Sequence, residues 1–78
     1  MVVLVKTEYR AKFIELQKDH IFTSKLHRHL EQIDINRMKG RSYKKSFNLK
    51  KEVIELTFEF TQNPEEKIMI EKVNIINK

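Results

Sequence analysis

Three histidines are the side chains of this 78-residue chain that are best suited to hold a metal ion or to transfer a proton near neutral pH. His27 and His29 lie two positions apart, so on a helix they point about 200° away from each other and cannot share a metal ion. His20 falls in the preceding connection. We therefore expect neither a metal site nor a cofactor. We expect His29 to be partly buried beside Leu26 and Ile33, and His27 to be solvated.

Other catalytic arrangements lack the residues that they need. The chain has no cysteine, which excludes a disulfide, thiolate-bound zinc and a cysteine nucleophile. A single glycine excludes a glycine-rich phosphate loop. So short a chain offers little depth for a cleft of converging carboxylates, and Glu65 and Glu66 fall in a predicted turn. These observations favour a binding protein over an enzyme.

Positive charge is concentrated in the middle of the chain. Residues 1–51 carry 13 basic and 5 acidic residues, whereas residues 52–78 carry 3 and 6, giving the net charge of +5. The stretch RMKGRSYKKSFNLKK has no acidic residue and seven basic ones: Arg37, Lys39, Arg41, Lys44, Lys45, Lys50 and Lys51. Clustered cations bind the phosphates of nucleic acid or an acidic protein surface. This stretch, with Tyr43, is the predicted binding surface.

The aromatic and flanking residues of this stretch have two interpretations. An exposed Tyr43 would stack on unpaired bases. Alternatively, Tyr43 belongs to the core, Arg37 and Lys39 end a helix, and Lys50 and Lys51 solvate a turn. Phe47 is expected in the core because it shares its strand face with a leucine. The acidic residues that follow (Glu52, Glu55 and Glu59) are expected to pair with lysines across a sheet, or else to hold a basic partner.

The first half of the chain predicts a short strand and two helices. Val2 to Val5 favours a strand, although an extension of the first helix remains open. The spacing of Tyr9, Phe13 and Leu16, widened by Ile14, predicts a helix over 7–18 with Thr7 as its N-cap. A second helix is predicted after Thr23 or Ser24. Its apolar face is Phe22, Leu26, His29, Leu30 and Ile33, and Gly40 is expected at the left-handed position that ends it.

The second half has the two-residue period of strands. Strands are predicted over 43–49, 54–61 and 67–76, with a turn at Asn63 and Pro64. Asn48 to Phe60 also fits a helical stripe, but its aromatic and threonine content favours a strand. A change of parity after Ile70 predicts either a bulge near Glu71 and Lys72 or burial on both faces. The predicted fold is one α+β domain over 1–78, ordered β-α-α-β-β-β, with a helical hairpin on a C-terminal antiparallel meander.

The start of the chain shows no targeting signal. Met1 to Val5 is too short for a signal peptide or a membrane span, so we expect a cytoplasmic protein of a bacterium, or of the bacterial host of a phage, with no membrane partner. A homodimer is an alternative to a monomer, since neither a disulfide nor a metal ion is expected to stabilise so small a core. The abundance of Lys, Asn and Ile is typical of AT-rich genomes, including mobile elements.

This layout resembles the RelE/ParE superfamily, the small bacterial toxins of toxin–antitoxin modules. The resembling segments are VVLVK, TEYRAKFIELQK, the second helix ending RMKG, SYKKSFNL, EVIELTFEF and EKIMIEKVNIINK. The resemblance implies that Arg37, Lys39, Arg41, Lys44 and Lys45 face RNA. Where the ribonucleases of this superfamily often carry a YR-x-x-Y strand and a C-terminal Tyr or His, this chain has EVIELTFEF and VNIINK.

Two main functional hypotheses follow. The first is a small non-enzymatic regulator or inhibitor, of the kind encoded by phages or mobile elements. It would dock its basic edge on nucleic acid or on a protein that processes nucleic acid. The alternative is a RelE/ParE-like toxin, acting as a ribonuclease or a target poison. A purely structural subunit is a third interpretation.

Overall fold

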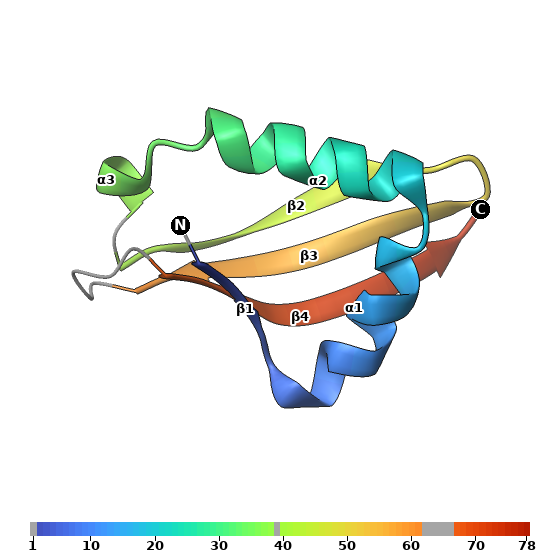
Figure 1. Ribbon diagram of the computed structural model, residues 1–78, viewed down its shortest axis with the longest axis horizontal. Coiled ribbons are helices and arrows are strands. Elements are labelled where there is room, and N and C mark those ends of the chain that lie inside the picture. Colours follow the sequence, from blue (N-terminus) through green and yellow to red (C-terminus); the bar gives the residue numbers. More distant parts are fainter. Residues whose placement is uncertain (1, 39, 62–66) are drawn as a thin grey trace.

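The computed structural model describes residues 2–38, 40–61 and 67–78 and has the predicted α+β architecture (Figure 1). The order of elements is β1 (Val2–Val5), a 3-10 turn (Thr7–Tyr9), α1 (Arg10–Gln17), α2 (His20–Gln32), α3 (Ile35–Met38), β2 (Ser42–Asn48), β3 (Glu52–Phe60) and β4 (Lys67–Asn77). The turn predicted at Asn63 and Pro64 lies outside the described residues, and so does Lys39.

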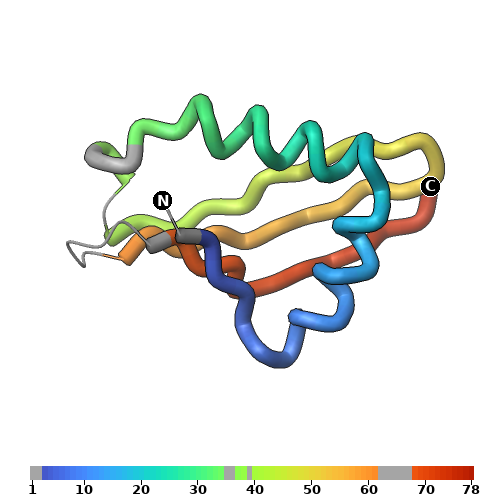
Figure 2. Tube along the Cα trace, viewed as in Figure 1, coloured from blue at the N-terminus to red at the C-terminus, as the bar shows by residue number. Residues whose placement is uncertain are grey.

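The four strands form one mixed sheet in the order β1-β4-β3-β2. β2, β3 and β4 form the predicted antiparallel meander. β1 pairs in parallel with β4, with Val3 beside Ile68 and Val5 beside Ile70, so the first residues are a strand and not an extension of α1. Because β1 pairs with the first half of β4, the two ends of the chain lie at opposite ends of the sheet (Figure 2).

A bulge in β4 explains the change of parity seen in the sequence. Thr57 pairs with Lys72 but Phe58 pairs with Ile70, which leaves Glu71 as the extra residue. The insertion returns Val73 to the face that already carries Ile70, and both side chains are buried. Of the two interpretations drawn from the sequence, the bulge is therefore confirmed.

The first helix is shorter than predicted. Residues 7–9 form a 3-10 turn, α1 begins at Arg10, and Thr7 is not its N-cap. Phe13 and Leu16 are buried as expected, and Tyr9 packs against them. Ile14 is 50% exposed, so it does not widen the apolar stripe. α1 lies near β4 at one side of the sheet (Figure 1), and it contributes a narrow apolar stripe to the core.

The second helix begins at a different cap from the one predicted. Asp19, and not Thr23 or Ser24, precedes α2, and its Oδ1 accepts hydrogen bonds from the amides of Ile21 (2.9 Å) and Phe22 (3.2 Å). The Thr23 hydroxyl donates instead to the carbonyl oxygens of Gln17 and Asp19. An aspartate at the N-cap supplies both an acceptor and a negative charge to the helix N-terminus.

The second helix also ends earlier than predicted. α2 stops at Gln32, Ile33 has an extended backbone, and the separate helical turn α3 follows. Asp34 and Asn36, which have low helix propensity, fall at this break. Gly40 has the expected positive φ of 72°, but it follows α3 and its amide donates to the carbonyl of Phe60.

The helices cover one face of the sheet. The buried side chains of β3 are Ile54, Leu56, Phe58 and Phe60, and they form one cluster with Phe22 and Leu26 of α2 and with Phe47 of β2. Edge contacts join Phe22 to Phe13 and to Phe47, with ring centroids 6.2 and 5.8 Å apart. The alternation predicted for β3 and the core position of Phe47 are thus confirmed. The opposite face of the sheet, the open face, carries no helix.

Within the described ranges, none of the helices has both the length and the apolar character that crossing a membrane requires.

Candidate functional site

The central part of the predicted binding surface lies on β2, which is an edge strand of the sheet. Side chains alternate along a strand, so neighbouring lysines point to opposite faces. Lys45 shares the helix-covered face with Tyr43 and Phe47, whereas Lys44 lies on the open face in a hollow that also includes Glu55 and Lys72. Both lysines are exposed. Lysine on an edge strand also discourages pairing with the edges of other sheets.

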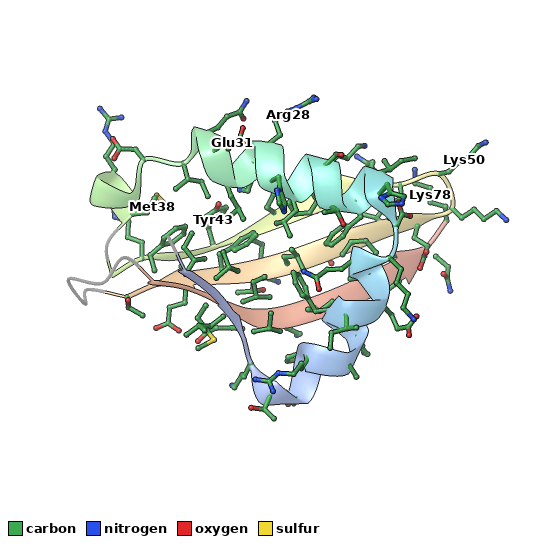
Figure 3. All side chains as sticks on the ribbon, in the orientation of Figure 1. Arg28, Glu31, Met38, Tyr43, Lys50 and Lys78 are labelled. Carbon is green, nitrogen blue, oxygen red and sulfur yellow. The ribbon has the colours of Figure 1, made fainter. Side chains whose placement is uncertain are left out.

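The other cations of the surface that the structure describes lie at the two ends of β2. Arg41 precedes the strand, beside α3, whose Arg37 is 3.7 Å from Asp34 (Nε to Oδ2). Lys50 and Lys51 occupy the turn to β3, and Figure 3 shows Lys50 at the end of the sheet opposite Met38 of α3. Seven strand residues span about 20 Å. The predicted cations therefore follow one edge of the molecule, but they point in several directions.

A hollow between α2 and β2, which we call the basic groove, brings other cations to this edge. Its volume is about 270 Å³. Its lining comes from one side of α2 and from the end of β2: Lys25, Arg28, His29, Gln32, Lys45, Ser46, Phe47 and Asn48. Three of these side chains are cationic and none is a carboxylate. Of the predicted binding residues that the structure describes, Lys45 alone lines the groove. Lys25 and Arg28 were not predicted, although their three-residue spacing places them on one helix face.

Backbone geometry at the edge of β2 adds donors to the groove. The Leu49 amide donates to the Glu52 carbonyl, and the Phe60 amide donates to the Arg41 carbonyl, so the odd-numbered residues of β2 direct their backbone groups toward β3. The amide of Ser46 consequently points to the open edge. The carbonyl of Asn48 points there too, and it accepts a hydrogen bond from Lys25 Nζ at 2.5 Å. This bond ties α2 to β2 at one end of the groove.

His29 lines the inner side of the groove and contacts Tyr43, which lies behind it. His29 Nε2 lies 2.5 Å from the Tyr43 hydroxyl oxygen, and the imidazole ring packs against Tyr43, Phe47 and Phe58. Burial lowers the pKa of His29 from 6.5, and the nearby charge of Lys45 lowers it further. Burial raises the pKa of Tyr43. Both rings are therefore neutral at pH 7. His29 is partly buried as expected, and His27 is exposed.

The ring of Tyr43 faces the core. It stacks on Phe60, with centroids 5.7 Å apart and planes 7° apart, and on Phe58 at 5.4 Å and 29°. Figure 3 shows Tyr43 between α2 and the sheet, whereas Arg28 extends outward from α2. The predicted surface is therefore rich in cations, but its aromatic rings are engaged with other aromatic rings of the protein.

Within the part of the chain that the structure describes, no lysine forms an ion pair with the acidic side chains of β3, contrary to our expectation. Glu55 accepts a hydrogen bond from Asn74 Nδ2 at 3.2 Å. Glu59 lies beside Glu71 of the bulge; hydrogen bonding and repulsion between these carboxyl groups, with some burial, raise the pKa of Glu59, and Lys6 partly opposes the rise. Among residues 2–38, 40–61 and 67–78, no group of three or more potential metal-ligating side chains gathers.

Comparison of the chain with protein-family models, with curated proteins and with solved structures finds no match. The basic groove itself therefore carries the functional argument. Its donors are cationic or neutral, and its chemistry is that of binding an anion.

Proposed function

We propose that the protein is a non-enzymatic binding module that docks the edge formed by α2 and β2 on the phosphate backbone of nucleic acid. The observation that carries the proposal is the basic groove, where Lys25, Arg28 and Lys45 meet and no carboxylate lines the hollow. Cations from two different elements converge there. Phosphate is the anion that nucleic acid presents at every residue, and its neutralisation releases bound counterions.

The neighbouring surface extends this groove into a longer track. Lys44, Lys50 and Lys51 continue along the same edge of the sheet, and Arg41 lies at its other end. The aromatic rings of β2 pack on core residues, so we expect contacts with phosphates and not stacking with bases. Binding is therefore expected to depend strongly on salt and weakly on sequence.

The proposal is tested with short single-stranded and duplex oligonucleotides by fluorescence anisotropy at several salt concentrations. Reversing Lys44 and Lys45 to Glu is expected to abolish binding at physiological salt while far-UV circular dichroism stays unchanged. Each phosphate contact that is lost lowers the slope of log K against log salt by about 1. The matched control is Arg10→Glu with Lys12→Glu, the same charge change on exposed positions of α1. Equal weakening by both variants, or wild-type binding by the first, rejects the edge as the interface.

A RelE/ParE-like toxin is the second candidate, and one observation favours it. His29, whose ring contacts the Tyr43 hydroxyl, lines the same hollow as Lys45, so a group able to accept a proton at pH 7 lies beside the cations of the groove. This candidate predicts growth arrest when the protein is expressed alone, with cleaved cellular RNA and relief by His29→Gln. Normal growth with intact RNA removes it and leaves the binding proposal in place.

A further inference from the structure

We propose that the basic groove is a pocket for the terminal phosphomonoester of a nucleic-acid strand, in addition to the phosphodiester contacts along the β2 edge. The inference rests on the proposed function and specifies the ligand of the same site. It starts from the difference between the groove and the rest of the edge. The edge is a row of separated cations, whereas in the groove Lys25, Arg28 and Lys45 surround a single hollow of about 270 Å³.

The charge of the hollow matches a monoester better than a diester. A phosphodiester carries one negative charge, and the strand continues on both sides of it. A terminal phosphate carries a charge of about −1.5 to −2 at pH 7 and three strong acceptor oxygens, and it ends the strand. Three cations around a hollow of this size suit that compact, multiply charged group, because charge-assisted hydrogen bonds to one phosphate add together.

The donors of the groove are placed for such a group. Lys45 projects from the covered face of β2, and the Ser46 amide points to the open edge beside it. Arg28 lines the groove from α2 and extends outward from that helix (Figure 3), and its planar guanidinium can bond two oxygens. Lys25, which also lines the groove, donates a hydrogen bond to the Asn48 carbonyl, so its ammonium group is already held beside the hollow.

The inner wall gives the site a spectroscopic reporter. His29 lines the groove with one ring nitrogen engaged by Tyr43, and the groups that face it are Lys45, Tyr43, Phe47 and Phe58, with Lys25 and Arg28 on its own helix. A phosphate dianion opposes the charge of Lys45, which is one cause of the lowered pKa of His29. Occupancy by phosphate is therefore expected to raise the pKa of His29.

The decisive experiment compares oligonucleotides of one sequence with an internal fluorophore and a 5′-phosphate, a 3′-phosphate or hydroxyls at both ends. We expect one of the phosphorylated strands to bind roughly tenfold or more tightly than the hydroxyl strand, which is the effect of one or two charged hydrogen bonds. Equal affinity for all three strands overturns the phosphate pocket and leaves the proposed function standing. Absence of binding by all three overturns the proposed function itself.

Variants of two adjacent lysines distinguish binding in the groove from binding along the rest of the edge. Lys45→Gln is expected to abolish the preference for the terminal phosphate, whereas Lys44→Gln weakens the phosphorylated and hydroxyl strands equally and preserves their ratio. A separate titration with inorganic phosphate, followed by NMR, is expected to shift the resonances of the His29 ring and of the Ser46 amide. If these resonances do not shift while those of exposed lysines elsewhere do, phosphate binds only diffusely. That result rejects the pocket, whichever oligonucleotide binds most tightly.

Discussion

His29 of α2 and Tyr43 of β2 form a direct side-chain contact between the helical layer and the sheet, with Nε2 and the hydroxyl oxygen 2.5 Å apart. The pair is partly buried among phenylalanines, and both rings are neutral at pH 7. Burial disfavours the charged form of each ring, so the stability of the fold is expected to fall both at acidic pH, where His29 gains a proton, and at alkaline pH, where Tyr43 loses one.

The free energy of unfolding is expected to fall as pH drops below about 6.5, the ordinary pKa of His29. Its lowered pKa means that the unfolded chain takes up a proton there while the folded protein does not, so acid favours unfolding. Urea unfolding across this pH range measures the slope. His29→Gln should flatten it, whereas His27→Gln, on the exposed side of the same helix, should leave it as it is. An unchanged slope in both variants would contradict the prediction.

At the alkaline end, stability is expected to fall as pH rises above about 10. The raised pKa of Tyr43 means that the unfolded chain loses its proton before the folded protein does, which favours unfolding. Tyr43→Phe removes this ionisation and should weaken the alkaline loss. Tyr9→Phe, which changes the other tyrosine of the chain, is the matched control. Measurement is by thermal unfolding between neutral and strongly alkaline pH, and equal effects of the two variants would argue against Tyr43 as the source.

Phe22 joins α1 and α2 to the sheet, and truncating its side chain is expected to remove much of the free energy of unfolding. It is fully buried and contacts Phe13 and Phe47. Phe22→Ala should cost about 3–5 kcal/mol against a total stability of about 4–12 kcal/mol for a chain of this size. The adjacent Ile21 is 58% exposed, so Ile21→Ala should change stability by less than about 0.5 kcal/mol.

Both variants are measured by urea unfolding. Phe22→Leu, which keeps most of the apolar side chain, should give a measurable intermediate loss even if Phe22→Ala does not fold. Comparable losses at positions 21 and 22 would mean that α2 packs on the sheet through a different face.

Asp19 is expected to stabilise the start of α2 through its two accepted hydrogen bonds. Asp19→Ala should cost about 0.5–2 kcal/mol, and Asp19→Asn, which keeps an acceptor oxygen, should cost less. Ser24→Ala tests the start that the sequence suggested, and we expect a change within about 0.5 kcal/mol. Thermal unfolding of the three variants gives the comparison. A larger loss from Ser24→Ala than from Asp19→Ala would move the helix start back to the position first predicted.

Glu59 and Glu71 on the open face are expected to destabilise the protein at neutral pH. The raised pKa of Glu59 favours its protonated form, so the stability that it contributes at low pH is lost as pH rises through that value. Glu59→Gln should raise the melting temperature at pH 7 and have little effect below about pH 4.5. Glu55→Gln on the same strand face, whose carboxyl group bonds Asn74, should give no such gain. A gain that is independent of pH would point to packing instead of charge.

Local periodicity was sufficient for much of this fold. The alternation of β3 and the shared face of Phe47 and Leu49 could be read from the sequence, because side-chain direction along a strand follows directly from backbone geometry. The change of parity after Ile70 could be read too, but the structure was needed to choose the bulge at Glu71 over burial on both faces. The positive φ of Gly40 was predicted for a different reason, because glycine has no Cβ and readily adopts the left-handed conformation that follows a helix. The first and last residues of α2 were not predicted correctly, because several residues near each end are acceptable caps and tertiary packing selects among them.

The sequence by itself determined that a basic stretch enters a strand of a small α+β domain, since composition and strand period are properties of contiguous residues. Only the tertiary structure decided that β2 is an edge strand, that β1 runs parallel to β4, and that Lys25 and Arg28 complete the basic groove with Lys45. These relationships join segments that are distant in the sequence. They depend on how α2 packs against the sheet, which no local pattern records.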